Sequence, residues 1–202
     1  MTLPCLPFAW LLLLLLVIPL PAPADEATVV VSRLQEALLQ SMKEGEKLGF
    51  EGRYRLLEPV VEEAFDFPAI ARLVLGRFWR KLDPQQREAF LDAFRELSVA
   101  TYAHRFDTWN GERFETAEEK MLKKDRRLIK TYLVKANGER VELDYLVHRR
   151  GENWKILNVI ADGVSDLSLK RAEYTSIIKD KGFPQLLDKL HENIERYRHE
   201  GR

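Results

Sequence analysis

The sequence predicts an α+β domain: N-terminal helices, a four-stranded antiparallel meander sheet and two C-terminal helices, which together enclose an apolar pocket. Two observations predict this class. Apolar residues recur three or four positions apart before residue 110 and again after residue 165, the spacing of amphipathic helices. Between these regions, apolar and polar residues alternate in short runs bounded by turn residues, as in antiparallel strands. This order of elements favours a sheet that is covered by helices on one side.

The first 24 residues read as a targeting segment. They contain no Lys, Arg, Asp or Glu, and a leucine run lies inside an apolar stretch over 8–18. That stretch is shorter than the ~20 residues that a spanning helix needs. An Ala-Pro-Ala motif at 22–24 suits signal-peptide cleavage, so we expect a signal peptide over 1–24 and a single domain over 25–202. Because no basic residue precedes the leucine run, a retained N-terminal anchor is the alternative.

Charge and cysteine content exclude several kinds of protein. Cys5 is the only cysteine and lies in the targeting segment, so the mature domain would have no thiol for a disulfide, a nucleophile or a zinc site. The chain has 32 basic and 32 acidic residues. A net charge of zero argues against nucleic acid as a partner.

Four helices are expected before the strands. An amphipathic pattern over 27–47 predicts the first, and shorter patterns predict helices over 55–65 and 68–75, the latter capped by Asp66 and ended by Gly76. Asp83-Pro84 is typical of a helix start and should open a long helix that runs to about Trp109. This helix carries apolar residues on two faces, which indicates that it packs between layers or lines a cavity.

Strands are expected over 113–122, 128–134, 141–148 and 154–160, with Asn137-Gly138 and Gly151 at turns. The bend Gly163-Val164-Ser165 then leads into helices over 166–181 and 184–198. Gly182 separates these two helices, and glycine is the residue best suited to a left-handed helix end.

No motif in the chain predicts catalysis or metal binding. None of the four histidines has metal-ligand spacing, so we expect His104 in the core or lining a cavity and the others in solvent. The carboxylates Asp144, Asp162 and Asp166 fit no calcium loop, and Asp144 is expected on a polar strand face. A basic cluster lies at the first hairpin: Lys120, Lys123, Lys124, Arg126 and Arg127. It is either a solvated turn or a contact for anionic lipid head groups or an acidic partner.

Short motifs along most of the mature chain resemble the MlaC, or toluene-tolerance, family and its HpnM branch, which is associated with hopanoid-producing bacteria. The motifs are Leu75-Gly76-Arg77-Phe78-Trp79-Arg80, Pro84-Gln85-Gln86-Arg87, Leu143-Asp144-Tyr145-Leu146-Val147, Trp154-Lys155-Ile156, Gly163-Val164-Ser165 and Gly182-Phe183. The resemblance implies a periplasmic carrier that binds a phospholipid or hopanoid in an apolar cavity. It also implies exchange of lipid between an outer-membrane lipoprotein complex and an inner-membrane ABC transporter complex, with no cofactor and no catalytic group.

Large apolar residues that exceed the needs of a small sheet are the expected pocket lining, although such residues are more often plain core. They are Phe78, Trp79, Phe94, Leu97, Tyr102, Leu143, Tyr145, Val147, Ile156 and Val164. The alternatives to a carrier are a periplasmic enzyme or a ligand-free interaction module, each with a nuclear-transport-factor-like α+β fold. An enzyme should place a His/Asp or Tyr/Asp pair inside the pocket, and an interaction module should have a filled core.

Overall fold

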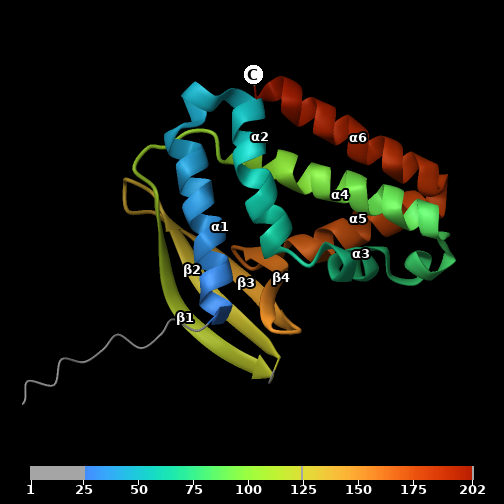
Figure 1. Ribbon diagram of the computed structural model, residues 1–202, viewed down its shortest axis with the longest axis horizontal. Helices are drawn as coiled ribbons and strands as arrows, with labels where there is room; N and C mark the ends of the chain where they lie inside the picture. The colour runs from blue at the N-terminus through green and yellow to red at the C-terminus, as the bar shows by residue number, and fades with distance from the viewer. Residues whose placement is uncertain (1–25, 124, 202) are drawn as a thin grey trace, which may run out of the picture.

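Helices cover one side of a curved antiparallel sheet in the computed structural model, which describes residues 26–123 and 125–201 (Figure 1). The strands are adjacent in chain order, as expected of a meander. Their bounds are β1 Arg113–Lys123, β2 Arg126–Val134, β3 Arg140–Arg150, β4 Asn153–Ala161 and β5 Val164–Ser165. The α+β class and four long strands are therefore confirmed, and the expected bend at Val164-Ser165 forms a short fifth strand. The expected signal peptide lies outside the described residues.

Two N-terminal helices cross and flank the sheet: α1 Glu26–Lys43 and α2 Gly45–Ala64. The helix expected over 55–65 begins ten residues earlier than predicted, at Gly45. Gly49 does leave helical geometry, with φ 57° and ψ −176°, but the chain resumes the helix directly afterwards. The buried guanidinium of Arg53 secures this region by donating to the carbonyl oxygens of Ala103 (2.8 Å) and Gly45 (2.8 Å).

The middle helices begin at the expected caps. The Asp66 carboxylate accepts from the backbone N–H of Ala69 (3.1 Å) at the start of α3 Phe67–Leu75. A 3₁₀ turn, η1 Gly76–Lys81, fills the connection to α4 Pro84–Arg105. Asp83 and Gln86 form a capping box at the start of α4. This helix ends four residues before the expected Trp109, because Phe106 leaves helical geometry with φ −111° and ψ 61°.

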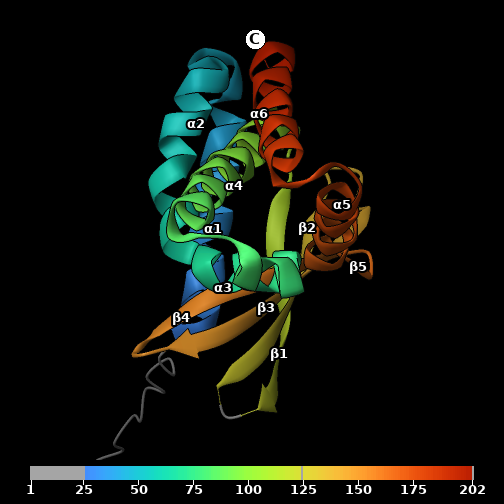
Figure 2. The same ribbon diagram turned by 90° about the vertical axis from the view of Figure 1, so that its right-hand side faces the viewer.

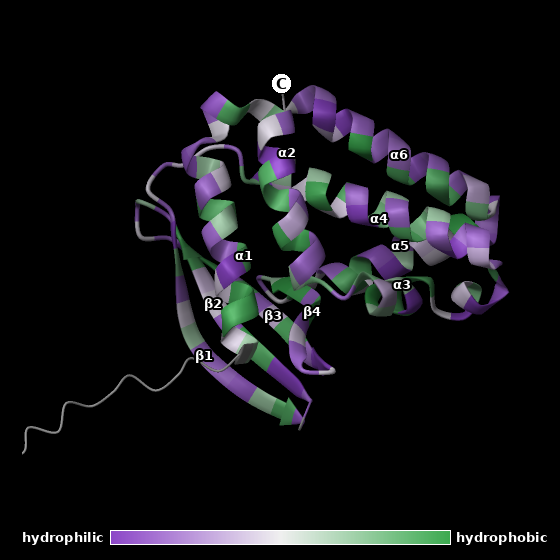
Figure 3. Ribbon diagram, in the orientation of Figure 1, coloured by the Kyte–Doolittle hydropathy of each residue, from purple (hydrophilic) through white to green (hydrophobic). Residues whose placement is uncertain are grey.

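The C-terminal helices are α5 Asp166–Lys181 and α6 Phe183–Glu200, separated by Gly182 at φ 87°. The buried face of α6, formed by Leu186, Leu190 and Ile194, lies on α4 (Figure 2). In Figure 3 hydrophobic and hydrophilic residues alternate along the helices, as expected of helices with one buried face. None of the described helices is long and apolar enough to cross a membrane.

A β-bulge in β4 determines which residues face the helices. Val147 lies opposite Ile156, but Leu146 lies opposite Asn158, so Leu157 is the extra residue. Directly opposed residues share a face of a sheet. The helix-facing side chains of β4 are therefore Trp154 and Ile156 before the bulge and Val159 and Ala161 after it.

Candidate functional site

An apolar cavity of about 480 Å³ lies between the helix-facing side of the sheet and the helices α3, α4 and α5. Strand β3 contributes alternate residues from Val141 to Tyr145, and β4 contributes residues on both sides of the bulge. The apolar lining from the strands is Leu133, Val141, Leu143, Tyr145, Leu157, Val159, Ala161 and Val164, and that from the helices and their ends includes Phe65, Phe67, Ile70, Phe94, Tyr102 and Phe106. Its volume lies within the ~300–1,000 Å³ of ligand pockets.

The deep wall of the cavity carries no charge at neutral pH. Tyr145 is only 2% exposed, and burial raises the pKa of its hydroxyl to about 12, against a smaller opposing effect of a hydrogen bond with Gln35. Burial also raises the pKa of Tyr102 well above its usual range. The Gln35 amide in turn donates to the Thr131 hydroxyl (3.0 Å), which donates to the carbonyl oxygen of Leu143 (2.6 Å). The polar groups behind this wall are therefore satisfied, and apolar surface faces the cavity.

The mouth of the cavity combines exposed apolar and charged residues. Val164 is 52% exposed and Leu169 is 59% exposed, so apolar surface reaches solvent at the mouth. The charged lining residues are Arg105, Glu112, Lys135, Asp166 and Lys170. Lys170 pairs with Asp166 (2.5 Å) and Lys135 with Glu139 (2.8 Å), whereas Arg105 forms no ion pair with a described residue. An anionic group at the mouth would find this guanidinium free.

The structure brings five of the ten expected lining residues to this cavity: Phe94, Tyr102, Leu143, Tyr145 and Val164. The other five lie elsewhere in the molecule. Val147, Ile156 and Leu97 are buried in the main core. Phe78 and Trp79 lie on η1, where Phe78 borders a separate basic groove against α5 and Trp79 stacks under the Arg87 guanidinium at 5.6 Å.

Sequence reasoning missed several lining residues for an identifiable reason. Continuing the alternation from Trp154 and Ile156 would place Asn158 and Ile160 beside them, not Val159 and Ala161. The bulge at Leu157 reverses this alternation, and no turn residue in the strand signals it. The sequence shows that Val141 and Leu133 are apolar strand residues. That they line the cavity follows only from where α4 lies over the sheet.

Sequence comparison with protein families identifies the chain. It matches the family described as MlaC protein over residues 32–192, which is most of its length. The chain belongs to the MlaC family. This confirms the expected family, and with it the expectation that the chain is not an enzyme. The comparison covers the MlaC family as a whole, so the assignment to the HpnM branch stays a prediction.

Two MlaC-type proteins illustrate the similarity. The chain is 27% identical over 124 residues to the intermembrane phospholipid transport system binding protein MlaC of Haemophilus influenzae. This alignment spans 59% of the chain and 58% of that relative. A solved structure of a phospholipid-binding protein from Ralstonia solanacearum, in complex with a phospholipid, superposes with a TM-score of 0.75 at 20% identity. The superposition covers 86% of the chain and 99% of that structure, which confirms the fold.

Two polar residues of this MlaC-family chain are more buried than the sequence indicated. His148, expected in solvent, approaches Asp66 to 3.0 Å between Nε2 and Oδ2, and its side chain is only 18% exposed. Asp144, expected on a polar face, is 6% exposed, and its Oδ1 has no hydrogen-bond partner. The expectation for His148 was wrong, whereas Asp144 does share a sheet face with Lys130, away from the helix-facing Tyr145, but is buried on that face. Neither residue lines the cavity, and the described residues contain no cluster of acidic, histidine or cysteine side chains suited to a metal.

His104 takes neither catalytic nor cavity-lining position. Its ring stacks on Tyr197 of α6 at 4.7 Å, and Nε2 lies 3.6 Å from the exposed carboxylate of Glu200. His104 is partly buried between α4 and α6. It was expected in the core or lining a cavity, and it is neither fully buried nor part of the cavity lining. No described histidine lines the cavity, so its described lining holds no His/Asp pair. Tyr102 and Asp166 both line it, and the Asp166 carboxylate, which is paired with Lys170, adds to the effect of burial that raises the pKa of the Tyr102 hydroxyl.

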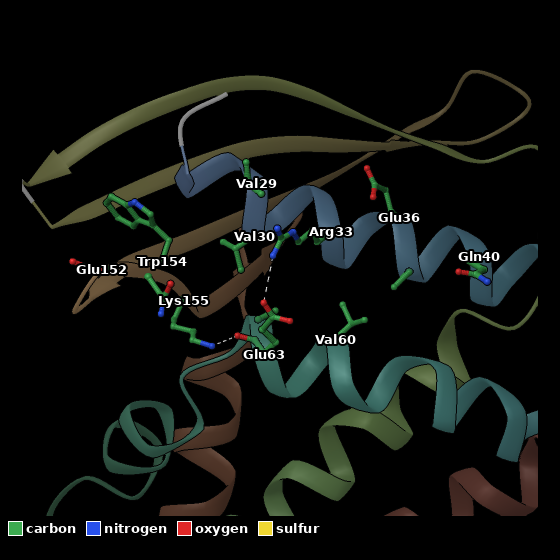
Figure 4. A pocket seen from close by; sticks show the side chains of 13 residues that line it. Val29, Val30, Arg33, Glu36, Gln40, Val60, Glu63, Glu152, Trp154 and Lys155 are labelled. Atoms are coloured by element: carbon green, nitrogen blue, oxygen red, sulfur yellow. Dashed lines mark hydrogen bonds and ion pairs between the residues drawn. The ribbon is translucent and has the colours of Figure 1, made fainter. Parts of the chain in front are cut away.

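A larger hollow of about 720 Å³ lies between α1, α2 and the β3–β4 turn (Figure 4). Its apolar floor includes Val30 and Val60, but charged side chains from all three elements surround it. Arg33 reaches Glu63 across it (3.4 Å), and the Lys155 ammonium donates to the Glu63 carbonyl oxygen. Acyl chains gain little from a charged, open surface, so the smaller apolar cavity is the better lipid site despite its lower volume.

Proposed function

We propose that this MlaC-family protein is a periplasmic phospholipid carrier that holds acyl chain in the cavity between the sheet and helices α3, α4 and α5. The observation that carries the proposal is the combination of an uncharged, apolar deep wall with a mouth that bears exposed apolar residues and an unpaired guanidinium. Amphipathic molecules with an anionic head group match this arrangement. No reacting group is needed, because carriage requires only burial.

The volume of the cavity suits one acyl chain. A methylene group is similar in size to a water molecule, whose share of liquid volume is about 30 Å³. The cavity of about 480 Å³ would therefore hold the equivalent of one long acyl chain. Each buried methylene contributes ~0.8 kcal/mol, so the free energy of one acyl chain of ordinary length is lower in the cavity than in water by on the order of 10 kcal/mol. A second chain would have to lie along the mouth, over Val164 and Leu169.

The head group would lie at the mouth. Arg105 offers a planar set of donors that matches phosphate in a bidentate arrangement, and it has no competing ion pair among the described residues. Lys135 and Lys170 lie on the same rim but are already paired with carboxylates. We therefore assign the phosphate to Arg105, with the two lysines adding to the positive potential.

Family membership and the two similar proteins support this proposal. The Haemophilus influenzae relative is named for phospholipid transport between membranes, and the Ralstonia solanacearum protein holds a phospholipid. By analogy, we propose that the partners are an inner-membrane ABC lipid transporter complex and an outer-membrane lipoprotein complex. Periplasmic location agrees with the apolar segment that precedes the domain.

The test is mass spectrometry of solvent extracts from protein purified without detergent, followed by uptake of phospholipid from vesicles. A carrier should release phospholipid in near-equal molar amount and take it up again after delipidation. A protein that yields no lipid and takes up none would contradict the proposal. Hopanoid in the extract would support carriage but change the cargo, and it would favour the HpnM branch.

A further inference from the structure

The hairpin between β1 and β2 ends in an exposed apolar pair surrounded by cations. Met121 is 66% exposed and Leu122 is 46% exposed, both high values for large apolar residues. Lys120, Lys123 and Arg126 flank them, and none of the three forms an ion pair within the described part of the chain. In Figure 3, β1 is hydrophilic over most of its length and hydrophobic towards this end.

The local backbone explains why the apolar pair is not buried. The pairing of β1 with β2 shifts between Met121 and Lys123, so Leu122 is an extra residue without an opposite partner. Met121 lies opposite Arg127, whose guanidinium bonds to Glu119 (2.8 Å) and lies over the Trp154 ring at 5.0 Å. Arg127 and Trp154 therefore pack against each other beside Met121 on the inner face, while Met121 and Leu122 themselves remain exposed.

The hairpin end extends away from the helices, where no other described element covers it (Figure 2). The start of α1 lies at the same end, because the Thr28 hydroxyl donates to the Glu119 carboxylate at 2.8 Å. Within the hairpin the exposed acidic residue at the turn is Asp125, while Glu118 and Glu119 are paired with Lys130 and Arg127. Exposed Arg149 adds a further cation beside Asp125, whose carbonyl oxygen accepts from the Arg149 backbone N–H (2.9 Å).

We propose that this hairpin end, formed by Lys120, Met121, Leu122, Lys123 and Arg126, is a docking surface for an anionic lipid bilayer. Cations attract the negative surface, and short apolar side chains enter the interface between head groups and acyl chains. An acidic protein partner would explain the cations but would leave the two exposed apolar residues unexplained. The proposal is independent of the lipid cavity, which lies at the other end of β2.

The experiment measures binding of the purified protein to vesicles of phosphatidylcholine alone and of phosphatidylcholine with phosphatidylglycerol, by co-sedimentation at low salt. The parent protein should bind the anionic vesicles and release them as salt rises. Replacing the three cations together, as Lys120→Gln, Lys123→Gln and Arg126→Gln, should weaken binding roughly 100-fold, at about fivefold per cation near an anionic surface. The control Arg77→Gln, Lys81→Gln and Lys179→Gln removes the same charge on η1 and α5 and should bind like the parent.

The apolar pair is tested separately. Met121→Ser with Leu122→Ser should lower the affinity at least tenfold without changing the thermal unfolding temperature, because both side chains are already exposed. In the opposite direction, the emission of Met121→Trp should shift to the blue on anionic vesicles, whereas that of Leu73→Trp, at an exposed position of α3 outside the cavity lining, should not. Equal loss of binding in both triple variants, no binding of the parent, or a shift confined to Leu73→Trp would each overturn the proposal.

Discussion

The carboxylate of Asp66 and the imidazole of His148 meet at 3.0 Å although the residues are 82 positions apart in the chain. The same carboxylate accepts from Arg150 (2.6 Å) and caps α3 through the Ala69 N–H (3.1 Å). One buried carboxylate thus joins the start of α3 to the end of β3. This contact positions α3, which carries Phe67 and Ile70 into the cavity wall.

Removing this carboxylate should therefore loosen the helix from the sheet. Asp66→Ala should lower the free energy of unfolding by about 2 kcal/mol, of which loss of the cap accounts for about 1 kcal/mol. Asp66→Asn keeps a capping side chain and should cost about half as much. Urea denaturation of both variants measures the difference, and an Asp66→Asn variant as stable as the parent would show that the pairing with His148 and Arg150 contributes nothing.

Asp144 should be a residue whose charge destabilises the fold. Burial raises the pKa of its carboxyl, with a further contribution from Glu142, while Lys130 opposes the shift. The folded state therefore favours the neutral carboxyl. The stability that this group contributes at low pH is lost as pH rises through its raised pKa. Asp144→Asn should raise stability by about 1 kcal/mol at pH 7 and have no effect below about pH 3.5. Exposed Asp125→Asn is the control, and a destabilised Asp144→Asn at pH 7 would show that Lys130 dominates.

Alkaline pH should destabilise the fold through the cavity tyrosines. Burial raises the pKa of Tyr145 to about 12, whereas an unfolded tyrosine ionises near pH 10. The stability from the neutral hydroxyl is thus complete below about pH 10 and lost as pH rises towards 12. Thermal unfolding between pH 8 and 11 should show a fall that is smaller in Tyr145→Phe. An identical fall in both proteins would mean that Tyr145 is accessible to hydroxide in the folded state.

Filling the cavity should reduce lipid binding without loss of fold. Val159 lines the apolar cavity. Val159→Phe introduces a larger side chain of a type that is common in β-strands. We expect phospholipid uptake from vesicles to fall at least fivefold. Ala37→Phe adds the same kind of side chain to the charged hollow between α1 and α2 and should leave uptake unchanged. If Ala37→Phe alone blocks uptake, the larger hollow is the lipid site.

The head-group assignment to Arg105 is tested by comparing two lipids. Arg105→Gln should weaken binding of fluorescent phosphatidylglycerol about tenfold, because a hydrogen bond to a charged group contributes roughly 1.5–3 kcal/mol when formed. Binding of fluorescent diacylglycerol, which lacks phosphate, should not change. Arg77→Gln serves as the control for loss of one surface cation. A variant that binds both lipids less well would show that Arg105 supports the cavity itself.

Much of the fold could be predicted from local signals. Caps at Asp66 and Asp83, and glycines at Gly76 and Gly182, fixed most helix bounds because each satisfies or ends backbone hydrogen bonding locally. The error at 45–54 had the opposite origin. Gly49 does break the helix locally, but Arg53 and the packing of α2 restore it through contacts with residues far along the chain. Such tertiary effects leave no local pattern.

The site was less accessible to sequence reasoning than the fold. Apolar residues such as Phe94 and Val147 look alike in sequence, yet the first lines the cavity and the second is fully buried in the core. What separates them is the distance between sheet and helix at each point, which depends on the whole arrangement. The contact between Asp66 and His148 was equally hidden, since neither residue has a spacing that points to the other.

The bulge at Leu157 makes the cavity depend on the number of residues in a strand as much as on their identity. If the same residues formed a regular strand without the bulge, Val159 and Ala161 would turn outwards and Asn158 and Ile160 would face the helices, whereas deletion of Leu157 itself would leave Val159 and Ala161 facing them. In that regular strand the side-chain Oδ1 of Asn158, which now accepts from the Leu167 N–H (3.0 Å), would leave the start of α5. The bulge therefore decides, together with the residues themselves, which side chains a lipid in the cavity would meet.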